Sequence, residues 1–280
     1  MAIREAFGRD GTSLVYRVTG ESTARPLVLL HGWAQTGSCW GEQLSAELAN
    51  RYRVVAVDLR GHGMSGAPEV GYDRTELWAG DVHAVLQQEG ITSGAVIAGW
   101  SYGGLVMCDY LSVYGTDAVA GVVFVSAITA IGPGRPGGAV GTAMRAAIPG
   151  VMSEDPRVAI RALGSFGTAL TGSGEGVGVA AQALFGASLA TRPRVRSAVF
   201  MRDLDHDATL AALDVPALVL HGTADTVVDV SAGEHTASVL PDARTSWWDG
   251  VDHGPFVVDP ARFRRDIDEF VDQLSPFVSR

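Results

Sequence analysis

Lysine is absent from this sequence of 280 residues, and all 21 basic residues are arginines. Schiff-base chemistry and catalysis by a lysine nucleophile are therefore excluded. The 31 acidic residues outnumber the arginines and give the chain a net charge of -10. Because a nucleic-acid partner needs clustered positive charge, this balance argues against one.

Cysteine and long apolar runs are also scarce. The two cysteines, Cys39 and Cys108, are too few for a disulfide framework and lack the spacing of metal ligands, so we expect both to be small buried residues. No apolar run approaches the roughly 20 residues that cross a bilayer. Residues 1–11 lack the apolar centre of a signal peptide. We therefore expect a cytoplasmic protein without a membrane partner.

Short apolar runs alternate with stretches of helical spacing along most of the chain. This alternation is typical of a parallel sheet covered by helices on both faces. The strand candidates are the runs 26–30, 54–57, 96–98, 122–125 and 216–220, a last strand at 245–248, and an N-terminal β-hairpin made of 3–7 and 13–18. Helices are expected at about 38–50, 74–89, 105–114, 231–240 and 262–274.

The alternation stops between residues 128 and 213. There, two glycine-rich tracts, 132–138 and 171–176, separate apolar segments of helical spacing, and no strand-like run occurs. An insertion at the carboxyl edge of a parallel sheet would cover the crevice where such sheets bind ligands. We therefore predict a helical cap at 128–213 on a core formed by 1–127 and 214–280. The alternative is a flexible linker between two domains, but the chain that follows is short for a second core.

One Gly-X-Ser-X-Gly motif occurs, and it is Gly99-Trp100-Ser101-Tyr102-Gly103. An apolar run precedes it and a helical pattern follows it, which predicts a strand, a sharp turn and a helix with Ser101 at the apex. The two glycines permit a strained turn and a close passage of strand and helix. The alternative is an inert serine in a glycine-rich turn.

A serine nucleophile needs a base that takes its proton and an acid that orients the base. For such a turn on a parallel sheet the expected chain order is Ser, then Asp or Glu, then His. Asp225 follows a buried strand at the same sheet edge as Ser101, and only His235 and His253 come after it. His253 lies in a loop beyond the last strand, whereas His235 falls in an expected surface helix. We therefore predict Asp225 and His253 as the partners of Ser101.

These residues resemble the α/β-hydrolase family over essentially the whole chain. The matching motifs are His31-Gly32-Trp33, Asp58-Leu59-Arg60-Gly61-His62-Gly63, Gly99-Trp100-Ser101-Tyr102-Gly103, Asp225 and His253. Within the family the chain is most similar to the cofactor-free esterases and the perhydrolases once called non-haem haloperoxidases. The resemblance implies a mostly parallel eight-stranded sheet with helices on both faces and a helical cap. It also implies a serine hydrolase with nucleophile Ser101, acid Asp225 and base His253.

Negative charge that develops on a substrate carbonyl oxygen needs two N–H donors. One donor is the backbone N–H of Tyr102, which follows the nucleophile, and the resemblance implies the backbone N–H of Trp33 as the other. The candidate substrate-binding residues near these two donors are Trp33, Trp100 and Gly254.

We expect a carboxylic ester hydrolase that acts on small to medium esters through an acyl-enzyme and requires no metal or organic cofactor. Perhydrolase, lactonase or carbon–carbon bond hydrolase activity on the same triad are alternatives. Ser101 argues against haloalkane dehalogenases and epoxide hydrolases, which need a carboxylate nucleophile. A different class, a hydrolase-like small-molecule receptor, would cleave slowly or stay acylated. The expected partner is a small ester, and the protein is expected to be a monomer or a homodimer.

Two further clusters have structural interpretations. His62 and Ser65 lie three residues apart in a glycine-rich turn and are predicted to stabilise it. Asp205, His206 and Asp207 are consecutive and therefore cannot all face one metal ion. They predict a solvated helix start with Asp205 or Asp207 as its N-cap.

Overall fold

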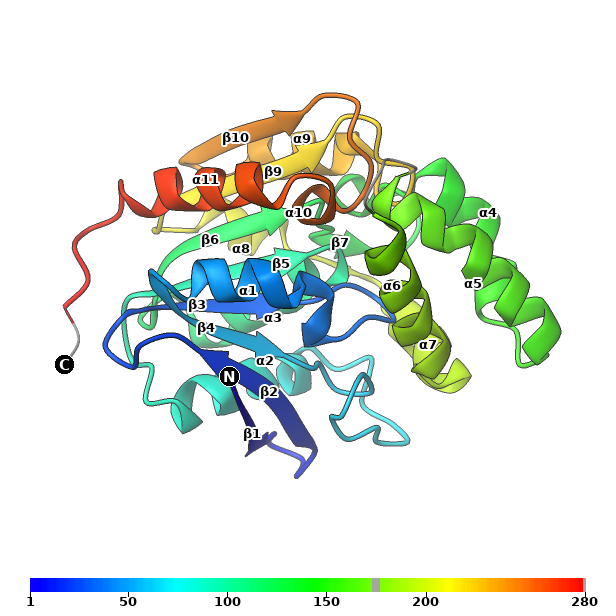
Figure 1. Cartoon of the computed structure of the whole chain (residues 1–280), viewed down its shortest axis with the longest axis horizontal. Helices are drawn as coiled ribbons and strands as arrows, with labels where there is room; N and C mark the ends of the chain where they lie inside the picture. Colours follow the sequence, from blue (N-terminus) through cyan, green and yellow to red (C-terminus); the bar gives the residue numbers. More distant parts are fainter. Residues whose placement is uncertain (173–176, 279–280) are drawn as a thin grey trace.

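The computed structural model describes residues 1–172 and 177–278, and its centre is a sheet of eight strands. The strand order is β1-β2-β4-β3-β5-β6-β9-β10 (Figure 1). β1 and β2 form the predicted antiparallel hairpin, β2 is antiparallel to β4, and the remaining neighbours are parallel. The mostly parallel eight-stranded sheet is thereby confirmed. Its strands are β1 (Ala2–Phe7), β2 (Ser13–Thr19), β3 (Arg25–Leu30), β4 (Tyr52–Val57), β5 (Ala95–Trp100), β6 (Val119–Val125), β9 (Ala217–Gly222) and β10 (Ala243–Trp248).

The middle of the sheet is covered on both faces. Every residue of β3, β5 and β9 is buried, as expected for strands that read as continuous apolar runs. β2, near one edge, instead alternates buried and half-buried residues. The core therefore runs through the centre of the sheet, and the strand ends there are rigidly supported.

Helices form a layer on each face (Figure 1). α1 packs against α11 on one face, while α2, α3, α8 and α9 follow one another in contact on the other. Their bounds are η1 (Gly37–Trp40), α1 (Glu42–Leu48), α2 (Thr75–Gln88), α3 (Tyr102–Tyr114), α8 (Asp207–Ala211), α9 (Val230–Val239), α10 (Pro255–Val258) and α11 (Pro260–Val271). The expected helix at 38–50 is thus divided into η1 and α1.

Four helices lie beyond the carboxyl ends of the strands, at the right of Figure 1. They are α4 (Thr142–Val151), α5 (Pro156–Thr171), α6 (Gly178–Ala190) and α7 (Pro193–Ala198). α5 packs against both α4 and α6, and buried residues of all four helices belong to the same apolar cluster as the sheet. Residues 173–176 of the second glycine-rich tract lie outside the described residues.

The sequence predicted no strand in this region, and the structure differs there. Two short strands, β7 (Ala130–Ile131) and β8 (Leu204–Asp205), pair in antiparallel fashion where the chain leaves the core and returns to it. Short 3-10 turns, η2 (Pro136–Gly138) and η3 (Val199–Met201), flank them. Strands of two residues are too short to produce an alternating pattern in the sequence.

None of the helices in residues 1–172 and 177–278 is long and apolar enough to span a membrane.

Candidate active site

Ser101 occupies the sharp turn that the sequence predicted between β5 and α3. Its backbone is strained, with φ of 55° and ψ of -120°, a conformation that residues other than glycine rarely adopt. A Cβ atom at Gly99 would lie 2.6 Å from backbone atoms of Gly103, and one at Gly103 would lie 2.2 Å from the Leu30 carbonyl oxygen. Both glycines are therefore required for strand and helix to pass closely, and the turn holds the serine at the carboxyl edge of the sheet.

Asp225 and His253 meet at the same edge, in the loops after β9 and β10. His253 Nδ1 lies 2.8 Å from Asp225 Oδ2. The other carboxylate oxygen, Oδ1, accepts the backbone N–H groups of Val227 and Val228 at 2.8 and 3.0 Å. These bonds fix the plane of the carboxylate and leave Oδ2 to orient the imidazole. Both side chains are almost fully buried.

A second histidine, which the sequence analysis did not assign to the site, also contacts Asp225. His221 Nε2 lies 3.2 Å from Asp225 Oδ2 and 3.0 Å from the Val228 carbonyl oxygen. Burial alone would raise the pKa of Asp225, but the charge of His253 and the hydrogen bond from His221 outweigh it and hold that pKa well below its usual range. The carboxyl group therefore stays ionised.

Ser101 and His253 line the same small cavity, together with Trp33 and Trp100. The structure thus brings the three predicted triad residues to one end of the sheet from positions 101, 225 and 253. The indole Nε1 of Trp100 donates to the His253 carbonyl oxygen at 2.9 Å, so the loop that carries the imidazole is tied to the strand that carries the serine.

The loop after β3 passes directly beside Ser101. A Cβ atom at Gly32 would lie 2.9 Å from Ser101 Cβ, so only glycine allows this approach. The next residue, Trp33, lines the cavity at Ser101. Tyr102 is the first residue of α3, so its N–H has no partner within the helix. The backbone segments that carry both predicted donors therefore lie next to Ser101.

Two buried histidines shape this loop. His31 Nε2 accepts the Leu59 N–H at 3.0 Å, and His62 Nε2 accepts the Ala34 N–H at 3.2 Å. Each imidazole thus accepts a backbone N–H from the loop that carries the other. Ala34 needs this support, because its φ of 54° is strained for a residue with a side chain. The structural interpretation of His62 is consistent with these contacts.

Both histidines must be neutral for this arrangement, because a protonated Nε2 would face a backbone N–H. Burial, together with the charge of His62, lowers the pKa of His31 to about 3. Burial also lowers the pKa of His62 to about 4. The remaining nitrogens, Nδ1, lie 2.7 Å from the Gly32 carbonyl oxygen and 2.9 Å from the Arg60 carbonyl oxygen, where they can donate.

The same loop is bonded to the helices beyond the strand ends. Trp33 Nε1 donates to the Arg196 carbonyl oxygen of α7 at 3.0 Å, and Gln35 Nε2 donates to Ser188 Oγ of α6 at 2.9 Å. The indole of Trp33 also packs edge-to-face on Phe166 of α5. Trp33 and Gln35 together therefore link the predicted oxyanion loop to three of these helices.

The guanidinium of Arg196 holds the helices themselves together. It is buried and donates to the carbonyl oxygens of Val151, Ser188 and Thr191 at 2.8, 3.1 and 2.6 Å. These carbonyls lie at the carboxyl-terminal ends of α4 and α6, where the helix dipole favours a cation. Burial lowers the pKa of this arginine.

A larger cavity of about 220 Å³ also borders Ser101. Trp33 and Tyr102 line it, as do Ile128 from the core and Phe200 from η3. No charged residue is among the described residues that line it. Such an enclosure suits an uncharged, apolar group.

Gly254 is not among the described residues that line either cavity. A Cβ atom there would lie 2.5 Å from the Leu170 carbonyl oxygen of α5, so the residue allows close packing of the His253 loop against that helix. Its contact with substrate stays a prediction, whereas Trp33 and Trp100 do line the cavity at Ser101.

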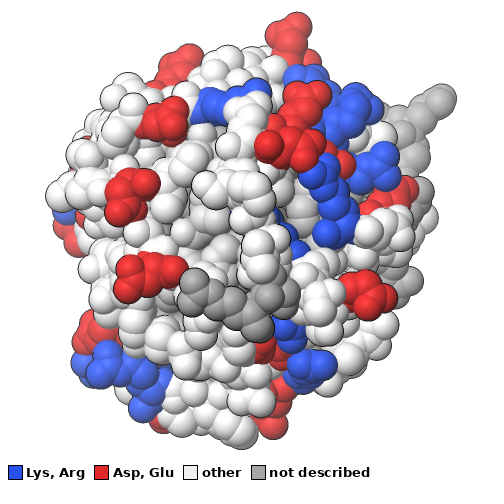
Figure 2. All heavy atoms as spheres, turned by 90° about the vertical axis from the view of Figure 1, so that its left-hand side faces the viewer, with Lys and Arg blue, Asp and Glu red and all other residues white. Residues whose placement is uncertain are grey.

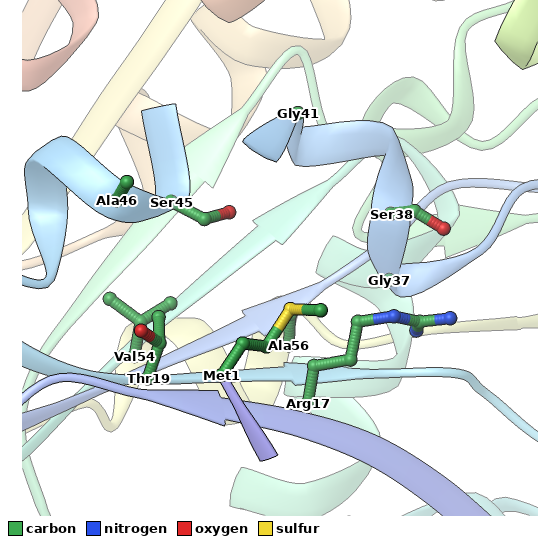
Figure 3. Close-up of a pocket in the computed structure, with 10 residues that line it drawn as sticks. All are labelled: Met1, Arg17, Thr19, Gly37, Ser38, Gly41, Ser45, Ala46, Val54 and Ala56. Atoms are coloured by element: carbon green, nitrogen blue, oxygen red, sulfur yellow. The ribbon is translucent and has the colours of Figure 1, made fainter. Parts of the chain in front are cut away.

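A separate cavity of about 340 Å³ lies between η1, α1 and the strands β2 and β4 (Figure 3). The side chain of Arg17 extends beneath Ser38 there (Figure 3), but its guanidinium is already paired with the buried Asp58 at 2.9 Å. None of the predicted site residues lines this cavity.

The prediction for residues 205 to 207 was wrong in two respects. The N-cap of α8 is His206, and no side chain caps that helix end. His206 is also buried rather than solvated, because its Nε2 lies 3.0 Å from Asp109 of α3. Asp207 is bonded to His235 instead. Within the described residues, no group of three or more His, Cys, Asp or Glu side chains could hold a metal ion.

Charges of both signs are interspersed on the end of the molecule opposite to α4–α7, with wide uncharged areas between them (Figure 2). Among the described residues of this face, no field of one sign dominates.

The family model "Alpha/beta hydrolase family" matches residues 27–266, and the chain belongs to this family. The family match confirms the resemblance that the sequence motifs predicted.

Individual relatives narrow the class. An esterase from Rhodococcus sp. ECU1013, known from its crystal structure, is 63% identical; the alignment covers 98% of this chain and 100% of that one, with a TM-score of 0.97. A non-heme chloroperoxidase of Kitasatospora aureofaciens is 30% identical over 95% of this chain and 98% of its own length. A bifunctional esterase/perhydrolase of Acinetobacter calcoaceticus is 37% identical over 43% of each chain. The chain is thus a hydrolase of the esterase and non-haem haloperoxidase branch.

Proposed function

We propose that the protein is a carboxylic ester hydrolase that uses Ser101, His253 and Asp225 as its catalytic triad. The observation that carries the proposal is the Asp225–His253 hydrogen bond of 2.8 Å beside a strained serine that shares a cavity with the imidazole. This combination matches the roles that nucleophilic catalysis by serine requires.

The reaction has two halves. His253 takes the proton of Ser101, whose Oγ bonds to the ester carbonyl carbon, and the oxyanion accepts hydrogen bonds from the Trp33 and Tyr102 backbone N–H groups. The bond from carbon to the alkoxy oxygen breaks, and His253 gives its proton to the departing alcohol. Water, deprotonated by the same imidazole, then attacks the acyl-enzyme and releases the acid and free Ser101.

We assign residues 128–213 the role of a cap over this site, on a core of 1–127 and 214–280. The support is that α4, α5 and η3 contribute Met144, Phe166 and Phe200 to the cavities at Ser101. Water is thereby restricted near the reacting atoms, which strengthens the interactions with the oxyanion.

The test measures, by pH-stat titration, how fast acid is released from a panel of esters that differ in both acyl and alkoxy groups. Wild type is expected to turn over many times, and Ser101→Ala to lose roughly 10³-fold or more in kcat. Ser112→Ala, an exposed serine of α3, is the matched control and should retain activity. A single burst without turnover would instead indicate a receptor, and activity that survives Ser101→Ala would refute the triad.

Perhydrolysis is a second reaction that the relatives favour, since one is a chloroperoxidase and another an esterase/perhydrolase. Hydrogen peroxide in place of water would attack the acyl-enzyme and release a peroxy acid. Peracetic acid formed from acetic acid and hydrogen peroxide should then depend on Ser101. If none forms while esters are hydrolysed, the enzyme is an esterase alone.

A further inference from the structure

Ser101 lines two adjoining cavities of very different size. The larger, about 220 Å³, is apolar and is lined by Tyr102. The smaller, about 10 Å³, is lined by Trp100, His253, Phe166 and Leu170. Both touch Ser101 and Trp33, so a bound ester carbonyl at Ser101 would extend one substituent into each.

If the protein is an ester hydrolase as proposed, the position of His253 decides which cavity takes the acyl group and which takes the alkoxy group. The imidazole must reach the alkoxy oxygen to protonate it. His253 lines the small cavity and is not among the residues that line the large one. The alkoxy group therefore faces the small cavity, and the acyl group enters the large one.

The volumes set the size of each group. A space of about 10 Å³ holds roughly one water molecule. It therefore suits the water of the second half-reaction, and it leaves room for only the smallest alkoxy groups in the first. The acyl cavity of about 220 Å³ exceeds the roughly 150 Å³ cavity that accepts benzene in another protein, so it accommodates a compact hydrocarbon acyl group of about ring size.

We propose that the enzyme is selective for methyl and ethyl esters of compact apolar acids, and that Phe166 of α5 sets the limit on the alcohol. Phe166 is buried, with 3% of its surface exposed, and lines the small cavity. Phe166 also lines a groove of about 440 Å³ between α4 and α5. A smaller side chain at this position would therefore widen the alkoxy site next to this groove.

The test compares kcat/KM for the methyl and benzyl esters of one acid, such as benzoic acid, by pH-stat. Wild type should prefer the methyl ester by about tenfold or more, since overfilling a packed site costs 1–3 kcal/mol. Phe166→Ala should reduce this ratio by raising kcat/KM for the benzyl ester. If the alanine variant does not fold, Phe166→Leu can replace it, because this smaller truncation keeps apolar packing with Trp33. Phe166→Leu should change the ratio in the same direction.

Val158→Ala is the matched control, because Val158 lines the groove but not the small cavity; its ratio should equal that of wild type. Equal kcat/KM for methyl and benzyl esters in wild type would overturn the proposal. The proposal would also be overturned if Phe166→Leu changed the selectivity for the acyl group but left the ratio of kcat/KM between methyl and benzyl esters unchanged. These outcomes all involve Ser101-dependent hydrolysis, whereas failure of the proposed function would abolish hydrolysis of every ester.

Discussion

At the residue scale, Asp225 receives more hydrogen bonds than a triad acid needs for orientation. Val227 and Val228 donate to one oxygen, while His253 and His221 both approach the other. Hydrogen bonds to a buried carboxylate stabilise its ionised form. His221 therefore helps to hold the Asp225 carboxylate ionised and in place.

Replacing His221 with leucine should lower kcat by about tenfold and destabilise the fold by about 1–3 kcal/mol, because a buried charged group loses a donor. The measurements are kcat from pH 5 to 9 and urea unfolding. His235→Leu, which changes a histidine of α9 away from the triad, is the control. An unchanged kcat with reduced stability would limit His221 to a structural role.

A second residue-scale prediction concerns Arg202. Its guanidinium is fully buried and donates to both carboxylate oxygens of Asp109 at 2.9 and 2.7 Å. It also approaches the Tyr102 hydroxyl at 3.3 Å, so the chain that follows α7 and η3 is anchored to α3. Arg202→Met would leave Asp109 buried without its main partner.

Arg202→Met should therefore reduce the free energy of unfolding by about 3–5 kcal/mol. Arg135→Met is the matched control, because Arg135 pairs with Asp203 and Asp205 at the surface, where ion pairs contribute little. Chemical denaturation of both variants gives the comparison. Equal losses of stability would contradict the importance of burial for the Arg202 pair.

At the element scale, the loops after β3 and β4 depend on the neutral pair His31 and His62. Their pKa values of about 3 and about 4 lie below the usual 6.5. The unfolded chain therefore binds more protons than the folded one below pH 6.5. Stability is fully present above that pH and is lost progressively as pH falls towards 4.

The loss should amount to about 1.4 kcal/mol per pH unit for each histidine. His62→Gln should lower stability at pH 7, because Gln has no donor in the position of Nδ1 for the Arg60 carbonyl oxygen, and should reduce the slope between pH 6.5 and 4.5. Urea unfolding at several pH values measures both effects. A variant with the same slope as wild type would show that His62 does not titrate on unfolding.

Element positions were largely predictable, and the reasons are local. β3 and β5 are continuous apolar runs, and the strained turn at Ser101 has glycines where backbones must touch. The 128–213 region was predicted less well. β7 and β8 are too short to give a pattern, and the partners of His206 and Asp207 lie far away in sequence, at Asp109 and His235. Consecutive polar residues alone could not reveal those contacts.

Within the site, chain order located Ser101, Asp225 and His253, but packing determined the rest. His221 contacts Asp225 only because the turn after β9 folds back. The unequal cavities result from how Phe166 and Leu170 of α5 approach His253. The first depends on the geometry of a turn and the second on the packing of a helix, and no pattern in the sequence indicates either.

At the scale of the whole molecule, one end of the sheet combines every part of the proposed chemistry. The strained serine, the ionised acid and the histidine come from three loops, and α4–α7 lie over that end (Figure 1). The opposite end carries charges of both signs, interspersed with uncharged areas (Figure 2). The central claim is therefore that Ser101 becomes covalently acylated during catalysis.

The most direct measurement is intact-mass analysis and peptide mapping after treatment with phenylmethanesulfonyl fluoride. Attack by Ser101 Oγ on sulfur would release fluoride, and the proton would leave through His253. We predict one adduct per chain, located on Ser101, with loss of esterase activity in proportion to labelling and no adduct in Ser101→Ala. An adduct elsewhere, or full activity in completely labelled protein, would contradict the account.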